Sequence, residues 1–297
     1  MPDLSISIVN YNARDYLDNC IQSIKNTVKD HSYEMIVVDN ASADGSVQLI
    51  SKKYPEVTIV QNDANLGFIK ANNMGLKRSK GRYLMSLNND TVALPGAVDR
   101  MIEFLDEHND TGAVGPKLLN SDGSLQLQAR RGFPSPQNSF LYFSGLSRLF
   151  PKNRVMGAYL LTYLDDKATV EVDSLCGAAM IVRREVIQKV GLMDESYFMY
   201  GDDIDWCYRI KQAGWKVYYL PEAEIIHYGG RGGSRRKSYR NIFEFHRAMA
   251  VFYGKHYAKR SLFLVNWTVF AGIWLKCAFE LIRNLFRKEK YVGTKKP

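Results

Sequence analysis

The N-terminal part of the chain alternates short apolar runs with amphipathic segments. The apolar runs occupy residues 5–10, 34–40, 57–62 and 82–90, and each is followed by a segment whose apolar residues recur at helical spacing. Strands and helices that alternate in this way are typical of a parallel sheet covered by helices on both faces. We therefore predict an α/β fold with a mostly parallel central sheet.

Three of the predicted strands end in polar residues. They are Asn10, Tyr11 and Asn12 after the first strand, Asp39 to Ser42 after the second, and Asn88, Asn89 and Asp90 after the fourth. Ligands of such sheets lie beyond the carboxyl ends of the strands. We therefore expect these side chains along one edge of the sheet, at a binding site.

The pattern becomes irregular after Gly115. The predicted elements that follow are a turn at Asp122 and Gly123, a loop-rich insertion over 137–170, a buried strand over 175–184, two short helices ended by Gly191 and Gly214, and two short strands, WKVYYLP and AEIIHYG. Two longer helical segments follow Gly233.

The composition is that of a globular protein. Of the 297 residues, 46% are apolar and 24% charged, so disorder is not expected. The cysteines are scattered at Cys20, Cys176, Cys207 and Cys277, without the CxxC spacing of a zinc site. Buried thiols in a reducing compartment are predicted instead, and the N-terminus lacks the layout of a signal peptide.

Charge is divided unevenly along the chain. Residues 228–297 hold 16 lysines and arginines against 3 acidic residues, a net charge of +13, whereas residues 1–227 hold 24 against 28, a net charge of −4. A basic tail on a slightly acidic body indicates an anionic partner, which could be nucleic acid, a phosphate-bearing substrate or a membrane surface.

One part of the basic tail is strongly apolar. Residues 261–275 carry no charge, and Lys259, Arg260 and Lys276 flank them. The stretch is shorter than the roughly 20 residues of a transmembrane helix. Apolar residues with basic flanks favour a helix at the membrane surface. The alternative is a buried helix that packs on the sheet domain.

The aromatic-rich segment YFMYGDDIDWCYRIKQAGW contains three carboxylates within four consecutive positions: Asp202, Asp203 and Asp205. Acidic residues are favoured in the first turn of a helix, which explains one or two of them but not three among aromatics. A carboxylate fixed at a helix start can act as a general base. Asp205 and Arg209 are four residues apart, so we expect them to pair on the helix.

Several motifs, in order along residues 5–230, resemble the inverting nucleotide-sugar glycosyltransferases of family 2 and their rhamnosyltransferase-like branch. These motifs are VVDNASADGS, NLGFIKANNMG, SLNNDT, CGAAMIVRREV, MYGDDIDWCYR and PEAEIIHYGG. The resemblance implies a GT-A fold with a catalytic domain over 1–230 and a C-terminal helical extension over 231–297. Within that domain, 1–115 would bind the nucleotide sugar, and 116–230 would supply the acceptor site and the base.

The resemblance also implies roles for the acidic cluster and for the second strand end. Asp203 aligns with the catalytic base, Asp202 is expected to orient the site, and Asp205 and Arg209 are expected to support it. Asp39 stands where the family binds the nucleotide base. Its alternative role is to cap the next helix or order the turn.

The phosphate-binding part of the site is implied at NLGF, whose Asn65 and Gly67 precede a helix, and at Asn73 within that helix. Helix N-termini bind phosphates, although NLGF could also be a plain turn. The glycine-rich RGGSRRK supplies Arg231, Arg235 and Arg236. These arginines could bind the donor diphosphate or the phosphate of a lipid-linked acceptor, or simply be solvated.

Asn88, Asn89 and Asp90 occupy the place of the family's metal-binding D-x-D triplet, of which only the third position is acidic here. Asp90 and His227 are the implied metal ligands, and Mg²⁺ or Mn²⁺ the implied cofactor. Since Mg²⁺ commonly takes one or two carboxylates together with phosphate oxygens, Asp90 could suffice with a bound diphosphate.

The predicted function is transfer of a sugar from dTDP-L-rhamnose or a UDP-sugar to a hydroxyl of a glycan or lipid-linked glycan, at the inner face of the cytoplasmic membrane. Three other classes of protein share some of these features. A nicotinamide-dependent enzyme needs GxGxxG where this chain reads NYNARD. A nucleic-acid-binding protein fits the tail but not the acidic body. A catalytically inactive sugar-nucleotide-binding relative is kept open by Asn88 and Asn89.

Overall fold

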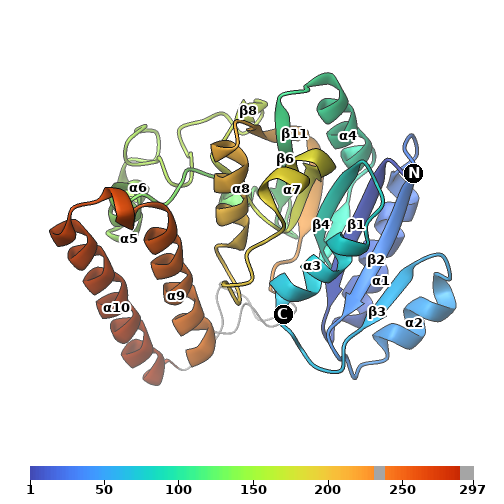
Figure 1. The fold of residues 1–297 in the computed structure, drawn as a ribbon, viewed down its shortest axis with the longest axis horizontal. Helices are drawn as coiled ribbons and strands as arrows, with labels where there is room; N and C mark the ends of the chain where they lie inside the picture. The colour runs from blue at the N-terminus through green and yellow to red at the C-terminus, as the bar shows by residue number, and fades with distance from the viewer. Residues whose placement is uncertain (231–237, 288–297) are drawn as a thin grey trace.

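The computed structural model describes residues 1–230 and 238–287, which form an α/β body with a pair of helices at its side (Figure 1). The strands are β1 (Leu4–Asn10), β2 (Tyr33–Asp39), β3 (Thr58–Gln61), β4 (Tyr83–Asn88), β5 (Thr91–Ala93), β6 (Thr111–Leu119), β7 (Arg130–Arg131), β8 (Val170–Glu171), β9 (Ser174–Leu175), β10 (Ala179–Arg183) and β11 (Lys216–His227). The helices are α1 (Arg14–Thr27), α2 (Ser46–Lys53), α3 (Phe68–Arg78), α4 (Ala97–Glu107), α5 (Pro136–Phe143), α6 (Leu146–Leu149), α7 (Arg184–Val190), α8 (Asp202–Gln212), α9 (Tyr239–His256) and α10 (Phe263–Leu285), with short 3₁₀ turns η1 (Leu127–Ala129) and η2 (Ala258–Arg260).

The main sheet has the order β3-β2-β1-β4-β10-β6-β11-β5, with β8 beside β11. The first four strands are parallel, as predicted. The second half is mixed, because β10 runs antiparallel to both β4 and β6. Strand β10 begins at the carboxyl end of β4, where Asn88 N donates to Ala178 O over 2.8 Å. This arrangement brings the chain segment before β10 directly to the ligand-binding edge of the sheet.

Strand β11 corrects one prediction. The segments WKVYYLP and AEIIHYG were expected as two short strands, but they form one strand that pairs along β6. Pro221 has no N–H to donate to the ladder. The strand accommodates it with a register shift between Leu220 and Glu224 and then continues to His227. The strand thereby carries His227 to the same edge as the ends of β1, β2 and β4.

Close packing of α3 on β1 fixes the start of α3 at this edge. Ile6 and Ile8 of β1 are fully buried, and Ser7 between them faces α3. A Cβ atom added to Gly75 would lie 2.2 Å from the Ser7 Oγ atom. Only glycine permits so close an approach of the helix to the strand.

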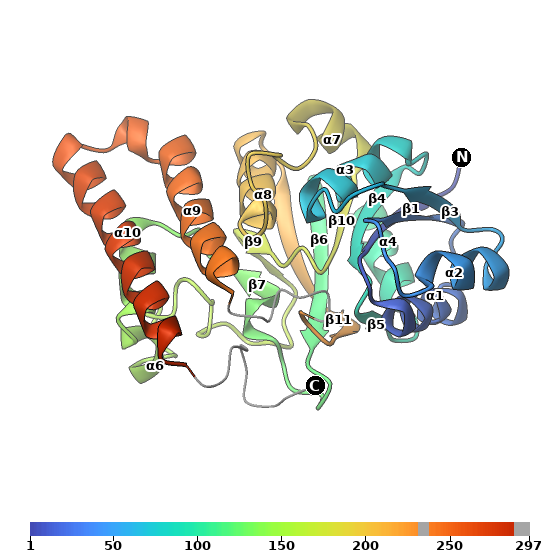
Figure 2. The same cartoon turned by 90° about the horizontal axis from the view of Figure 1, so that it is seen from below.

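Helices α9 and α10 pack against each other beside the body, as Figures 1 and 2 show from two directions. Helix α10 has 23 residues and extends well beyond the predicted uncharged stretch. By its length and composition alone it is long and apolar enough to cross a membrane. Its buried residues are Ile273, Cys277 and Asn284. The alternative of a buried helix on the sheet domain is therefore wrong.

Candidate active site

The polar strand ends meet at one edge of the sheet, as predicted. Asn10 lies opposite Asp39 in the ladder, and its Nδ2 donates to Asp39 Oδ1 over 2.9 Å. Asn10 Oδ1 in turn accepts a hydrogen bond of 2.9 Å from Asn89 Nδ2. All three side chains are buried, so these hydrogen bonds replace those that water would otherwise make. The three strand ends thus form one connected polar layer.

Asp39 also orders the turn that follows it. Its Oδ2 accepts a hydrogen bond of 2.8 Å from Ser42 N, and Ser42 Oγ accepts one of 2.9 Å from Asn12 N. The turn contains Ala41 at φ +62°, a left-handed conformation that such hydrogen bonds help to hold. The turn-ordering role weighed for Asp39 is therefore present, and recognition of a nucleotide base by Asp39 stays a prediction.

A cavity of about 450 Å³ lies at this edge. Six of the residues predicted to bind the nucleotide sugar line it: Tyr11, Asn65, Gly67, Asn88, Asn89 and Asp90. Its other walls carry Asp202 and Asp203 from α8, His227 from β11 and Phe245, Met249 and Phe252 from α9. Segments from both halves of the body and from α9 therefore line one cavity.

Asn73 lies elsewhere. Its Nδ2 donates to Met193 O over 2.8 Å, and its Oδ1 accepts from Met193 N over 3.2 Å. The side chain is buried and ties α3 to the loop before α8. The structure therefore gives Asn73 a bracing role, and its contact with the nucleotide sugar stays a prediction.

Asp203 is held in one orientation in the first turn of α8. Its Oδ2 pairs with Arg131 Nη2 at 2.5 Å and accepts a hydrogen bond of 3.0 Å from Gly177 N. Its Oδ1 accepts a hydrogen bond of 2.8 Å from Ile204 N. The carboxylate is mostly buried, yet it lines the cavity. It is therefore oriented by the protein before any substrate binds.

Asp202, the residue before Asp203, has a raised pKa. It is buried, and it also lines the cavity. Burial first, and then the charge of Asp203, raise the pKa of Asp202 to about 7. Two adjacent carboxylates in a cavity, one of them with a pKa near neutrality, are typical of a catalytic acid–base site.

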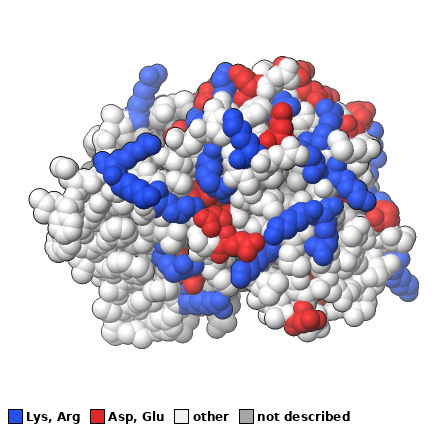
Figure 3. Space-filling view, viewed as in Figure 1, with Lys and Arg blue, Asp and Glu red and all other residues white. Residues whose placement is uncertain are grey.

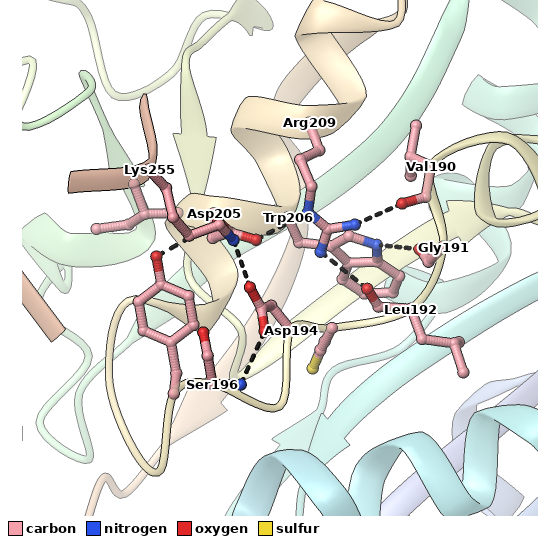
Figure 4. Close-up of polar contacts among 12 residues, drawn as sticks. Val190, Gly191, Leu192, Asp194, Ser196, Asp205, Trp206, Arg209 and Lys255 are labelled. Atoms are coloured by element: carbon pink, nitrogen blue, oxygen red, sulfur yellow. Dashed lines mark hydrogen bonds and ion pairs between the residues drawn. The ribbon is translucent and has the colours of Figure 1, made fainter. Parts of the chain in front are cut away.

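Asp205 forms the predicted pair with Arg209 and several contacts that were not predicted (Figure 4). Arg209 Nε donates to Asp205 Oδ2 over 2.8 Å, while Asp205 Oδ1 accepts from Lys255 Nζ over 2.6 Å and from His256 Nε2 over 2.7 Å. Burial would raise the pKa of Asp205, but the hydrogen bonds from His256, Lys255 and Arg209 outweigh it and hold that pKa well below its ordinary value.

Two of these partners, Lys255 and His256, come from the C-terminal end of α9. Arg209 also donates to the carbonyls of Val190 and Leu192, over 2.6 and 2.8 Å, and Lys255 pairs with Asp194 as well. Figure 4 shows these residues converging from α8, from the loop that precedes it and from α9. Asp205 therefore fastens α9 to the helix that carries Asp202 and Asp203, and its role in supporting catalysis stays a prediction.

His227 lies beside Asp90, with Nε2 3.3 Å from Asp90 Oδ1 and 3.3 Å from Asn88 Nδ2. Gln126 fixes the imidazole from the other side. Its Nε2 donates to His227 O over 2.6 Å, so its Oε1 faces His227 Nδ1 at 3.0 Å and accepts a hydrogen bond from it. His227 Nε2 therefore faces Asp90 and Asn88.

An imidazole lone pair and a carboxylate oxygen that face each other are a donor set for a divalent cation. Within residues 1–230 and 238–287, no group of three or more His, Cys, Asp or Glu side chains could hold a metal. A metal held by Asp90 and His227 would need phosphate oxygens and water as further ligands, as Mg²⁺ usually has, and it stays a prediction.

Four residues of this site were not found from the sequence: Arg131, Gln126, Lys255 and His256. Each acts on a partner at least 50 positions away, so no local pattern indicates it. The one sequence signal for Lys255 and His256 is the positive charge of the tail. That charge predicts an anionic partner outside the chain, whereas these two residues contact Asp205 within it. The predicted phosphate ligands Arg231, Arg235 and Arg236 lie outside the described residues.

Comparison with known proteins agrees with this geometry. The sequence profile described as glycosyl transferase family 2 matches residues 5–191. The chain is 26% identical to an N-acetylglucosaminyl-diphospho-decaprenol L-rhamnosyltransferase of Mycobacterium tuberculosis, over 97% of this chain and 95% of that protein. It is 25% identical to the rhamnosyltransferase WbbL of Escherichia coli, over 81% of this chain and 88% of that protein.

Among solved structures, the mannosyltransferase PcManGT from Pyrobaculum calidifontis in complex with GDP-Man and Mn²⁺ has a similar fold. The TM-score is 0.58 at 16% identity, and the match covers 95% of this chain and 72% of that one. This likeness confirms the predicted GT-A fold.

Proposed function

Since the chain belongs to glycosyl transferase family 2 and is a glycosyltransferase of the rhamnosyltransferase-like group, we propose that it inverts the configuration of the sugar it transfers. We propose dTDP-L-rhamnose as the donor and a hydroxyl of a lipid-diphosphate-linked glycan as the acceptor. The names of its relatives support both choices, since one is a rhamnosyltransferase whose name specifies a diphospho-decaprenol acceptor. A UDP-sugar is the alternative donor.

The observation that carries the proposal is the shared cavity. Asp90 and His227 line it together with Asp202 and Asp203. A nucleotide sugar bound with its diphosphate toward Asp90 and His227 would present its anomeric carbon to the acidic pair. This division of one cavity between diphosphate ligands and carboxylates is what an inverting displacement requires.

Asp203 is the proposed base. It accepts the proton of the acceptor hydroxyl while the hydroxyl oxygen bonds to the anomeric carbon, and the bond from that carbon to the nucleoside diphosphate breaks on the opposite face. Arg131 and the Gly177 amide hold its carboxylate in place throughout. Asp202 orients the acceptor beside it.

Asp90 and His227 would hold a Mg²⁺ or Mn²⁺ ion. When bound, such an ion stabilises the negative charge that develops on the leaving diphosphate. Gln126 keeps the proton of His227 on Nδ1, so Nε2 stays available as a ligand. Asn88 and Asn89 bring no charge of their own, so the ion would bind most strongly together with the nucleotide.

We place the enzyme in the cytoplasm, on the inner face of the cytoplasmic membrane. Helix α10 exposes large apolar side chains, among them Leu262, Phe263 and Trp267 at its start and Phe279 and Phe286 near its end. In Figure 3 the surface over α10 is largely uncharged, in contrast to the body. An apolar helix that ends in basic residues is suited to a membrane surface, where a lipid-linked acceptor resides.

The test is transfer by the purified full-length protein. We expect dTDP-L-rhamnose with Mg²⁺ or Mn²⁺ to give a product with an N-acetylglucosaminyl-diphospho-lipid acceptor, and nuclear magnetic resonance of that product to show an inverted anomeric centre. A retained configuration would refute the mechanism. Nucleotide binding without turnover on any donor would favour the catalytically inactive relative.

A further inference from the structure

A second cavity, of about 670 Å³, lies between α5, α9 and α10. We call it the α5–α10 groove. Its walls are almost entirely apolar and include Phe140 from α5, Phe252 from α9 and Val265, Val269 and Ile273 from α10. Its volume falls within the roughly 300–1,000 Å³ of small-molecule sites.

The groove adjoins the active-site cavity. Five residues line both of them: Pro134, Ser139, Phe143, Met249 and Phe252. A molecule in the groove can therefore extend into the cavity of Asp202 and Asp203 along a protein wall. The occupant of the groove is accordingly expected to be part of a substrate.

The other end of the groove opens on the apolar surface of α10. Leu264 lines the groove and is 73% exposed, and Val265 beside it is 41% exposed. Neighbouring Leu262 and Phe263 add to this surface. An apolar path therefore runs from the proposed membrane-facing surface to the acidic pair.

The end of the groove next to the active-site cavity carries a positive charge, which the other described residues of its lining lack. The charged residue of its described lining is Lys276, whose Nζ lies 4.9 Å from the ring centre of Phe143. Phe143 belongs to the wall that groove and cavity share. A cation at this junction suits a phosphate group that joins an apolar chain on one side to a sugar on the other.

We propose that the α5–α10 groove binds the polyprenyl chain of the acceptor lipid, with Lys276 at its diphosphate. This inference rests on the proposed function, because it assumes that the acceptor is a lipid-linked glycan. The polyprenyl chain of the lipid would move from water or the bilayer into the apolar groove. The acceptor sugar attached to it would then reach Asp203. The groove would select for the lipid as well as for the sugar.

Substituting Gly272 tests the groove directly. Gly272 lines it, and a Cβ atom added there meets no atom within 4 Å, so Gly272→Trp fills the groove without a clash at the backbone. Ala278→Trp is the matched control, because Ala278 is exposed on the same helix and is not part of the groove lining. Circular dichroism would establish that both variants fold.

The assay compares two acceptors with the same N-acetylglucosaminyl-diphosphate, one with a farnesyl chain and one with a methyl group. In the wild type and in Ala278→Trp, KM for the farnesyl acceptor should be lower by about tenfold or more. In Gly272→Trp the two KM values should become similar, with little change for the methyl acceptor. Equal KM values in the wild type would overturn the groove proposal while the transferase activity stood.

Photolabelling gives a result that needs neither activity nor a variant. A diazirine analogue of farnesyl diphosphate, irradiated with the wild type, should label peptides of α5 or the groove-facing side of α10, and unlabelled farnesyl diphosphate should compete. Labelling confined to the outer side of α10, at Leu275 or Phe279, would overturn the proposal even if transfer were observed. Labelling of the groove without any transfer would support it while the proposed function failed.

A second copy of the chain is the other occupant that an apolar groove admits. Sedimentation of the wild type and of Gly272→Trp in detergent separates the two cases. A dimer that dissociates in Gly272→Trp would show that the groove is a protein interface and would overturn the lipid proposal. A sedimentation coefficient that is the same for both proteins supports it.

Discussion

The two sides of the active-site cavity are held together by different interactions. At the sheet edge, Asn10, Asp39 and Asn89 hydrogen-bond to one another from adjacent strands. At α8, the carboxylates of Asp203 and Asp205 are held by cations, and several of these come from outside the helix. Neutral amides dominate the first side, and ion pairs dominate the second.

This difference shows how each side obtains its stability. The sheet edge is fixed by the register of β1, β2 and β4, which the strands' own apolar residues impose. The acidic side is fixed only when α9 and the β7 segment are in place, because a buried carboxylate without partners is costly. Substitutions on the acidic side should therefore alter activity and stability more than those at the sheet edge.

The largest effect is expected at Asp203. Asp203→Asn keeps the size of the side chain but cannot accept the hydroxyl proton, so kcat should fall by about 10²–10⁴. Nucleotide affinity, measured by calorimetry, should change little. Asp63→Asn, at an exposed acid, is the control. Turnover within threefold of the wild type would show that another residue is the base.

Substituting Asp202 should change the free energy of unfolding and its dependence on pH. Because its pKa is raised to about 7, the folded protein binds more protons than the unfolded chain between about pH 4 and 7, and stability falls as pH rises through that range. Asp202→Asn removes the buried charge, so at pH 8 it should be more stable than the wild type by about 2–4 kcal/mol.

Urea denaturation of both proteins at pH 5 and pH 8 measures this gain. The difference between them should be smaller at pH 5, where the wild-type side chain is already protonated. If Asp202→Asn is no more stable than the wild type at pH 8, Asp202 does not carry a strained charge, and the contrast between the two sides of the cavity weakens.

Substituting Gln126 tests the proposed metal site at Asp90 and His227. Gln126→Leu removes the acceptor that keeps the His227 proton on Nδ1, so Mn²⁺ affinity in the presence of nucleoside diphosphate should fall about 10–100-fold. Electron paramagnetic resonance of free Mn²⁺ measures this without turnover. The control is Gln128→Leu, at an exposed residue two positions away. Unchanged affinity would leave His227 a structural residue.

The smallest effect is expected at Lys255. Lys255→Met removes one of several partners of Asp205, and because Lys255 is about one-third exposed, the loss should be only about 1–2 kcal/mol. Urea denaturation would measure it, with Lys259→Met, at an exposed lysine, as the control. Destabilisation equal to that of the control would show that Lys255 does not help to fasten α9 through Asp205.

The same ion pairs give the wild type a marked acid sensitivity. The pKa of Asp205 is lowered on folding, so its contribution to stability is present above about pH 4 and is lost as pH falls further. Asp205→Asn should unfold more readily at pH 7 and show a weaker dependence on acid. Circular dichroism from pH 7 to pH 2 would follow both proteins.

Much of the fold was predictable from periodicity. The four parallel strands and their helices lie where the apolar pattern placed them, because each of these elements buries its own regular set of residues. The antiparallel direction of β10 was not predictable, since strand direction depends on long connections. Nor was the continuity of β11 across Pro221, which depends on pairing with β6.

The sequence by itself determined the polar strand ends, the acidic cluster and the Asp205–Arg209 pair, because strand ends and helix turns bring residues together over short, regular spacings. Only the tertiary structure decided that Arg131 holds Asp203, that Gln126 orients His227 and that α9 binds Asp205. Such contacts join residues far apart in the chain. Their geometry follows from packing, which no local spacing encodes.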